Sequence, residues 1–204
     1  MVIVTGTDTN IGKTLVSSWL CLHTGFGYFK PIQTGLSEGR DSDIVASLSN
    51  ALTYPETYCF QDPVSPHLAA ESEGCRIDIQ KTNLPVQDNL VIEGAGGVYV
   101  PVNEHALMLD LFKHLSQPVI LVASSRLGTI NHTLLSIKAI RDHKLTLLGV
   151  VMVGEDLLAN QKAIQHYGQT EILASLPWLD DVSQDSLRAL AFPVALQNIL
   201  GRKS

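Results

Sequence analysis

The chain has 204 residues, of which 45% are hydrophobic and 17% charged. A chain of this length buries roughly 70% of the surface that its unfolded form exposes, so we expect a single domain over residues 1–204. The formal net charge is −6, with 14 Lys and Arg against 20 Asp and Glu. This balance lacks the basic footprint of proteins that bind nucleic acid or anionic membranes, and we expect neither partner.

The first predicted element is an apolar, β-branched strand over Val2 to Thr5. It has no basic n-region before it and no small-residue cleavage site after it, unlike a signal peptide. No apolar run in the chain approaches the ~20 residues that span a bilayer. We therefore expect a cytoplasmic protein, in which Cys21, Cys59 and Cys75 are reduced thiols without a metal-binding spacing.

A glycine loop, GTDTNIGKT, follows this strand, and a helical pattern over Lys13 to His23 follows the loop. Strand, glycine loop and helix in this order are typical of a phosphate-binding loop, in which backbone N–H groups converge on a phosphate. Lys13 then supplies a positive charge, and the hydroxyl of Thr14 faces Mg²⁺. Five residues separate Gly6 from Gly12, so the loop is one residue longer than the strict motif.

The next polar candidates follow a short predicted strand at Tyr28 and Phe29. Pro31 keeps the backbone extended at Lys30, which can aim the ammonium inward toward a transferred phosphoryl group. A solvated surface lysine is the alternative. Farther along, Asp41 and Asp43 suit a helix N-cap with a solvated neighbour as well as they suit metal ligands.

Residues 54–89 are rich in Pro, Ser, Gln and Asp, and the only regular element expected there is a short helix near Pro66 to Glu71. A buried strand over Leu90 to Ile92 follows, and Glu93 comes directly after it in the run EGAGG. Open α/β sheets bind ligands at the carboxyl ends of their strands, and glycine backbone permits close approach. Glu93 is therefore a candidate ligand of a metal beside a phosphate, although a charge that only ends a strand is the alternative.

The remaining elements alternate between helix and strand. Helical periodicity covers Met108 to Leu115 and Asn131 to His143, and apolar strand patterns cover 119–123, 147–153 and, more weakly, 171–174. The alternation predicts an α/β fold, a doubly wound and mostly parallel sheet with helices on both faces, of the P-loop NTPase type.

Seven motifs together resemble the dethiobiotin synthetase family, in the same order and over most of the chain. They are GTDTNIGKT (6–14), KPIQTG (30–35), DSD (41–43), SPHLAA (65–70), EGAGG (93–97), LGTINH (127–132) and LPWL (176–179). A P-loop alone is shared with many ATPases, but the seven in order are specific. The resemblance implies an enzyme of biotin biosynthesis that uses ATP and Mg²⁺. Its substrates are 7,8-diaminononanoate and CO₂, which are joined through a phosphorylated carbamate into the ureido ring of dethiobiotin, with ADP and phosphate as the other products.

The resemblance also implies roles for individual residues. Lys13 and Lys30 stabilise the transferring phosphoryl group and the carbamate, Thr34 contacts the substrate, and Thr14, Asp43 and Glu93 hold Mg²⁺. The nucleotide is bound by Asn10, Ile11, Gly12, Lys13, Thr14, Leu15, Asp43, Glu93, Gly94, Ala95, Gly96, Leu176, Pro177 and Trp178. The active site lies at a homodimer interface, where Gly128, Ile130 and Asn131 of the second copy meet the carboxylate tail of the substrate, as suits a helix N-terminus.

The chain departs from the family pattern in two places. The Asn that commonly reads adenine after the late strand is absent here, where the chain continues as Val153-Gly154-Glu155-Asp156. We therefore expect looser discrimination between ATP and other triphosphates. Only sixteen residues separate Lys13 from Lys30, and we expect the core geometry to tolerate this trimming. The rival class is a nucleotide-switched partition ATPase, which usually carries an extra lysine where this chain has Thr7-Asp8-Thr9.

Overall fold

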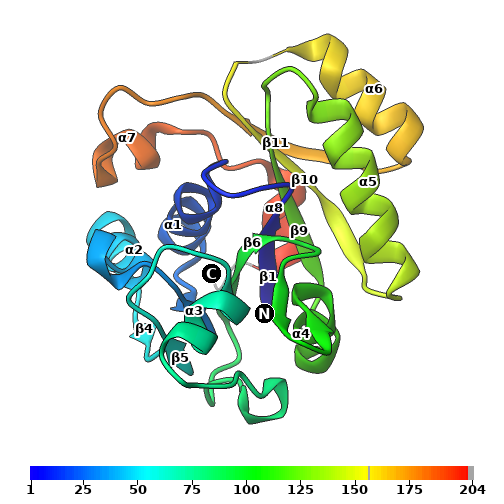
Figure 1. The fold of residues 1–204 in the computed structure, drawn as a ribbon. Coiled ribbons are helices and arrows are strands. Elements are labelled where there is room, and N and C mark those ends of the chain that lie inside the picture. Colours follow the sequence, from blue (N-terminus) through cyan, green and yellow to red (C-terminus); the bar gives the residue numbers. More distant parts are fainter. Residues whose placement is uncertain (156, 202–204) are drawn as a thin grey trace.

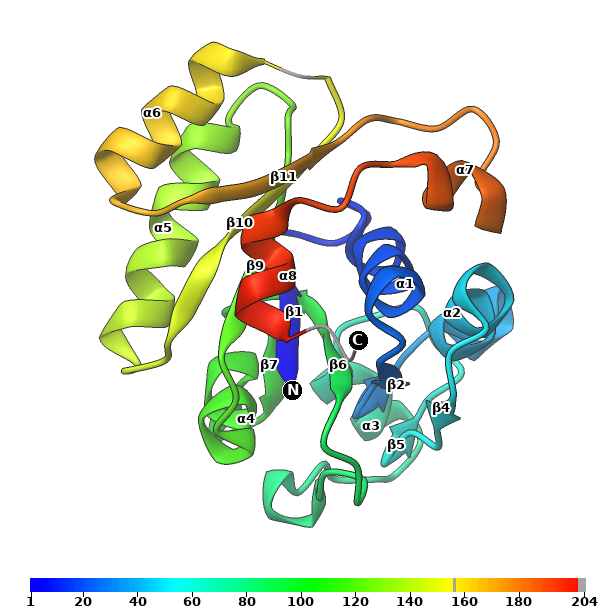
Figure 2. The same ribbon diagram turned by 180° about the vertical axis from the view of Figure 1, so that it is seen from behind.

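A computed structural model describes residues 1–155 and 157–201, and its centre is a seven-stranded sheet (Figures 1 and 2). The strand order is β11-β10-β9-β1-β6-β2-β4, and each of these pairings is parallel. The strands are β1 (Val2–Gly6), β2 (Gly27–Phe29), β4 (Thr53–Tyr54), β6 (Leu90–Gly97), β9 (Val119–Ser124), β10 (Leu147–Val153) and β11 (Ile172–Leu176). The predicted α/β sheet is confirmed.

Two small strand pairs lie outside the main sheet. Strands β3 (Ile32–Gln33) and β5 (Tyr58–Cys59) pair in parallel, and β7 (Pro101–Asn103) pairs with β8 (Ala106–Leu107) in the antiparallel sense. Single 3-10 turns occur at Leu36–Glu38 and Ile79–Lys81. Most of the 54–89 segment is thus irregular, as expected.

Helices cover both faces of the sheet. The helices on one face are α1 (Lys13–Thr24), α2 (Asp41–Ser49), α7 (Gln184–Ala189) and α8 (Val194–Leu200). Those on the other are α3 (Pro66–Ser72), α4 (Met108–Leu115), α5 (Thr129–Asp142) and α6 (Leu158–Gly168). No helix among residues 1–155 and 157–201 is both long and apolar enough to cross a membrane.

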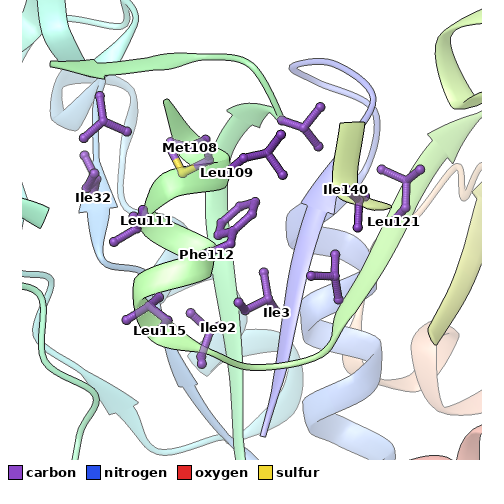
Figure 3. Close-up of a cluster of buried hydrophobic side chains, with 14 of the residues drawn as sticks. Ile3, Ile32, Ile92, Met108, Leu109, Leu111, Phe112, Leu115, Leu121 and Ile140 are labelled. Carbon is purple, nitrogen blue, oxygen red and sulfur yellow. The ribbon is translucent and has the colours of Figure 1, made fainter. Parts of the chain in front are cut away.

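The two cores follow from the alternation of side chains along the buried strands. Val2 and Val4 of β1 pack in the core that contains Trp19 of α1, whereas Ile3 packs in the core that contains Phe112 of α4 (Figure 3). Successive side chains of a strand point to opposite faces, so an unbroken apolar run is needed where both faces are covered. This is why β1, β6, β9 and β10 could be recognised from apolar runs.

Because the central strands are parallel, their carboxyl ends meet at one edge of the sheet. Strand β1 ends at Gly6, where the glycine loop begins. Its neighbour β6 pairs with it as far as Gly97, which is opposite Gly6, and the register shifts between Val4 and Gly6. Glu93 therefore lies within β6, not after it as predicted, and it is opposite Val4. The glycine loop and the EGAGG run thus meet at the edge where open α/β sheets bind ligands.

Candidate active site

The glycine loop turns sharply into helix α1. Gly12 has a φ of 98° and Asn10 a φ of 55°, both in the left-handed region that only glycine and a few polar residues adopt readily. A Cβ on Gly12 would lie 3.0 Å from Val153 at the end of β10, so the loop is also pressed against the sheet. The backbone N–H groups at the start of α1 are free of a side-chain cap, which leaves them for an anion.

Lys13 folds back over this loop. Its Nζ donates a hydrogen bond to the carbonyl oxygen of Asp8 at 2.8 Å, and only 7% of the residue is exposed. Burial lowers the pKa of Lys13, an effect that the nearby charge of Glu93 opposes. A buried ammonium beside backbone amides is the arrangement that neutralises a phosphate.

Two carboxylates converge on Thr14, the residue after Lys13. Its Oγ1 lies 3.0 Å from Asp41 Oδ1 and 3.0 Å from Glu93 Oε1. A hydroxyl has one proton and can donate to only one of these oxygens, so the other contact brings two oxygens together without a hydrogen between them. A hard cation with oxygen ligands would relieve this contact, and Mg²⁺ is commonly held by one or two carboxylates with substrate phosphates. The donor set therefore fits Mg²⁺.

Lys30 lies against the same two carboxylates. Its Nζ forms an ion pair with Asp41 and lies 3.5 Å from Glu93 Oε1. Burial by itself would lower the pKa of Lys30, but the charges of Glu93 and Asp41 outweigh burial and the pKa is raised. Lys30 is thus a buried cation and not a solvated surface lysine, because 6% of it is exposed.

The acid of the DSD motif that lies against Thr14 and Lys30 is Asp41, whereas the acid predicted to bind magnesium is Asp43. Helix α2 begins at Asp41, and residues two apart on a helix point about 200° away from each other. Asp43 is accordingly exposed on the other side of the helix. The backbone N–H of Asp41 donates to Gln33 Oε1 at 3.1 Å, which anchors this end of α2 beside Lys30.

Two further residues that the sequence did not single out contact Glu93. Ser17 Oγ and Tyr28 Oη donate to Glu93 Oε2 at 2.7 and 3.1 Å. Burial and the charge of Glu93 raise the pKa of Tyr28, so the phenol remains a donor. Ser17 follows Thr14 by three positions on α1, so the two side chains lie on one face of the helix. This spacing could have indicated from the sequence that Ser17 belongs to the site.

The glycines after Glu93 pass beside the phosphate-binding loop. A Cβ on Gly96 would lie 3.5 Å from Thr9 Oγ1, and one on Gly97 would lie 3.5 Å from the carbonyl oxygen of Thr7. Gly94 instead points toward α4, where a Cβ would lie 2.5 Å from the ring of Phe112. The backbone of this run thus borders the loop, but Gly94 is required by packing on the opposite face of the sheet.

Comparisons with known proteins agree with this site. The family model described as "AAA domain" matches residues 1–186. The ATP-dependent dethiobiotin synthetase BioD of Lawsonia intracellularis is 48% identical over 196 residues, which cover 96% of this chain and 97% of that protein. The same enzyme of Neorickettsia sennetsu is 41% identical, with 98% of this chain and 95% of that protein covered. The chain belongs to the dethiobiotin synthetase family.

A ParA family ATPase of Chlorobium tepidum shares the fold of this dethiobiotin synthetase family member. Its TM-score is 0.56 at 11% identity, with 92% of this chain and 88% of that chain covered. At this identity the likeness concerns the P-loop fold alone. The near full-length relatives favour the dethiobiotin synthetase family over the partition-type ATPase.

The residues predicted near the base of the nucleotide lie at the ends of β10 and β11. Gly154 donates from its backbone N–H to the carbonyl oxygen of Leu176 at 2.8 Å, and a Cβ there would lie 2.9 Å from the indole nitrogen of Trp178. Trp178 is 48% exposed, and the guanidinium carbon of Arg126 lies 5.8 Å from its ring centre. Pro177 is also exposed. Asp156, part of the departure from the pattern of the dethiobiotin synthetases, lies outside the described residues.

The predicted substrate-tail residues line a separate pocket of about 470 Å³ at the start of α5. Gly128, Ile130 and Asn131 are in its wall, together with the fully exposed Leu127. None of the loop or carboxylate residues lines this pocket. The residues predicted to hold the substrate tail thus share this pocket with Leu127 and not with the carboxylate cluster. Thr34 is half-buried, next to Gln33.

Proposed function

We propose that this protein closes the ureido ring of dethiobiotin from 7,8-diaminononanoate and CO₂ in an ATP-dependent reaction of biotin biosynthesis. The observation that carries the proposal is the convergence of Thr14, Asp41, Glu93 and Lys30 beside the glycine loop. A lysine and two carboxylates beside a loop of backbone N–H donors are suited to phosphoryl transfer, here from ATP to a carbamate. Family membership supports the choice of substrates.

The proposed reaction has three balanced steps. One amine of the diamine adds to CO₂ and loses a proton, which gives a carbamate. A carbamate oxygen then attacks the γ-phosphorus of ATP, and ADP leaves with the electrons of the broken P–O bond. The second amine finally attacks the carbamoyl carbon, phosphate leaves, and the amine proton goes to solvent or to the departing phosphate.

The residues of the site divide this work between them. The loop 10–15 holds the phosphates with its backbone N–H groups, and Lys13 balances their charge. Lys30 lies beside the carboxylate of Asp41, where its ammonium neutralises negative charge on the carbamate and on the phosphoryl group in transfer. Mg²⁺, held by Thr14, Asp41 and Glu93, would neutralise phosphate charge and orient the terminal phosphate. The pair of lysines leaves no need for an imidazole at the reacting centre.

The substrate is expected to extend from this site toward the pocket at α5 of a second copy. The diamine end of the substrate would lie near Lys30 and Thr34, where the carbamate forms. Its carboxylate tail suits the N-terminus of the 14-residue helix α5, where Gly128 leaves backbone N–H groups without a side-chain cap. The homodimer with shared sites is part of this proposal, and the pocket lined by Gly128, Ile130 and Asn131 is its candidate contribution from the second copy.

The decisive experiment measures phosphate release and dethiobiotin together. Purified protein is given MgATP and bicarbonate with or without 7,8-diaminononanoate, and the product is identified by mass. We expect phosphate release to need the diamine and to equal dethiobiotin formation mole for mole. Diamine-independent hydrolysis with no dethiobiotin would refute the proposal and favour a nucleotide-switched ATPase.

A further inference from the structure

The two oxygens of the Glu93 carboxylate have different surroundings. Oε1 faces Thr14 and Lys30, at 3.0 and 3.5 Å, in the part of the site that faces the glycine loop. Oε2 receives two neutral donors, Ser17 Oγ at 2.7 Å and Tyr28 Oη at 3.1 Å. The Glu93 side chain is 0% exposed, and Ser17 and Tyr28 are also completely buried. Water therefore does not substitute for either donor.

Building on the proposed function, we infer that Ser17 and Tyr28 are positioning residues that fix the rotation of the Glu93 carboxylate and present Oε1 to the metal. The terminal torsion of a glutamate side chain is broad, so a carboxylate without such partners would sample many orientations. Two donors on one oxygen restrict that rotation. Partners behind a metal-binding side chain commonly control its affinity in this way.

The fold supplies these donors from two different elements. Ser17 lies one helical turn after Thr14 on α1, and Tyr28 lies on β2, which pairs with β6. Tyr28 is opposite Val91, and side chains two apart on a strand share a face, so Tyr28 and Glu93 lie on the same side of the sheet. Lys30 follows Tyr28 by two residues and contacts the other oxygen.

The chemistry of the donors matters as well as their position. Both are hydroxyls that carry no charge, so they satisfy a buried carboxylate and leave its negative charge available for a cation. A lysine or arginine behind Oε2 would cancel that charge. The pair of hydroxyls thus stabilises the ionised, oriented state that a divalent cation requires.

The test measures Mn²⁺ binding to the protein with ATP and without diamine, from the electron paramagnetic resonance signal of free Mn²⁺ after correction for the Mn²⁺ that the same ATP concentration binds without protein. Tyr28→Phe removes only the hydroxyl and keeps the ring, and Ser17→Ala removes the second donor. We expect each change to weaken Mn²⁺ binding about 10-fold. Tyr58→Phe and Ser49→Ala are the controls, since their hydroxyls bond only to main-chain groups, and we expect them to stay within about twofold of wild type.

A double-mutant cycle with Glu93→Gln separates positioning from a general structural effect. If Ser17 and Tyr28 act through Glu93, their replacement should change Mn²⁺ binding by less than about twofold once Glu93 is an amide. Should Tyr28→Phe fail to fold, the Ser17→Ala cycle carries the test. Effects equal to those of the controls, effects that persist in Glu93→Gln, or a wild type that binds no Mn²⁺ with ATP would each overturn the inference.

These outcomes are independent of the ring-closing activity. The titration contains no diamine, so coupled Mn²⁺ binding with no dethiobiotin would refute the proposed function and leave the positioning role intact. Conversely, dethiobiotin formation with unchanged Mn²⁺ binding in Tyr28→Phe and Ser17→Ala would refute the positioning role alone.

Discussion

The buried ammonium of Lys30 lies against two carboxylates, and their negative charges determine its protonation state and its contacts. Asp41 and Glu93 raise the pKa of Lys30 despite the opposing effect of burial, so the amine is charged throughout the physiological pH range. Glu93 Oε1 and the carboxylate of Asp41 are also expected to bind a divalent cation. Lys30 and the cation therefore compete for them, and arrival of the cation should free the ammonium for phosphoryl and carbamate oxygens.

Replacement of Lys30 by alanine tests that role. We expect Lys30→Ala to lower kcat by about 10²- to 10³-fold and to leave ATP binding nearly unchanged, because its charge is needed where charge develops during transfer. Steady-state kinetics and calorimetric ATP binding measure the two effects. Lys138→Ala, at an exposed pair with Asp142, is the matched control. A normal kcat in Lys30→Ala would remove this lysine from the mechanism.

The two acids of the DSD motif give a sharper contrast. Asp41 contacts Thr14 and Lys30, whereas Asp43 is exposed on the far side of α2. We expect Asp41→Asn to raise the Mg²⁺ concentration for half-maximal activity by about 10-fold or more, and Asp43→Asn to change it by less than about twofold. Activity is measured across a Mg²⁺ titration at fixed ATP. The reverse order of the two variants would restore Asp43 as the ligand.

At the scale of elements, β6 serves the site on one face and the core on the other. Glu93 contacts Ser17 of α1, while a Cβ on Gly94 would meet the ring of Phe112 of α4, which is labelled in Figure 3. A glycine beside a phosphate-binding loop is readily interpreted as a ligand contact. Here its lack of a side chain is required by packing, because a Cβ would overlap the phenyl ring.

The stability of Gly94→Ala measures this packing. We expect it to lower the free energy of unfolding by about 1–3 kcal/mol through overpacking, as read from denaturant unfolding with the linear extrapolation. In a Phe112→Leu background the added methyl group has room. The loss of unfolding free energy caused by Gly94→Ala should then fall to well under half of its value in the wild-type background. An equal cost in both backgrounds would show that the phenyl ring is not the reason for the glycine.

The ends of β10 and β11 carry the residues that we propose to contact the base of the nucleotide. Val153 is buried against Gly12, and the backbone N–H groups of Gly154 and Ser125 already bond to strand carbonyls. The ring face of Trp178 can stack on any base. Its side chain does not have the paired hydrogen-bond donor and acceptor that would read the edge of adenine. We expect kcat/KM for ATP to exceed that for GTP by less than about a thousandfold, roughly 4 kcal/mol. A larger ratio, measured with both nucleotides, would contradict this.

Sequence reasoning succeeded where one local pattern fixes the structure. The bounds Met108–Leu115 were predicted to the residue because apolar positions fall on one helical stripe, and β1 and β10 were evident as apolar runs. The glycine loop was recognised from its place between a strand and a helix, and Glu93 from the glycines that follow it, although β6 extends through Glu93. Short helices such as α7 and α8 were not recognised, since six or seven residues carry too little periodicity.

The rest of the site depends on relations that no single segment contains. The choice between Asp41 and Asp43 depends on where α2 begins, and the Gln33 side chain, eight residues earlier, anchors that end. Ser17 and Tyr28 meet at Glu93 from positions 76 and 65 residues away in the chain. Such contacts arise from strand order and helix rotation, which local patterns do not specify.

At the scale of the whole molecule, the proposed function includes a dimer in which each copy completes the active site of the other. The carboxylate and lysine cluster lies at the edge of the sheet, and the pocket near Asn131 is lined by a separate group of residues. In a twofold dimer each active site would take Lys30 from one copy and Asn131 from the other. A substitution of Lys30 on one copy and a substitution of Asn131 on the other should then leave one intact active site in the mixed dimer.

A mixing experiment tests this arrangement. Lys30→Ala and Asn131→Ala are each expected to be nearly inactive at low diamine concentration, the first in transfer and the second in holding the substrate tail. Random reassociation makes half of the dimers mixed, and each mixed dimer has one fully intact site of two. The mixture should therefore recover about a quarter of wild-type activity.

The control pairs two variants from the same half of the site. In a mixed dimer of Lys30→Ala and Asp41→Asn, each site carries one of the two lesions, so the mixture should not exceed the average activity of the two variants, whatever the extent of mixing. Recovery in the first mixture and none in the second requires a site built from two copies. Equal behaviour of both mixtures, with mixed dimers demonstrated by mass, would instead mean that each copy holds a complete active site and that the pocket beside Asn131 binds something other than the substrate tail.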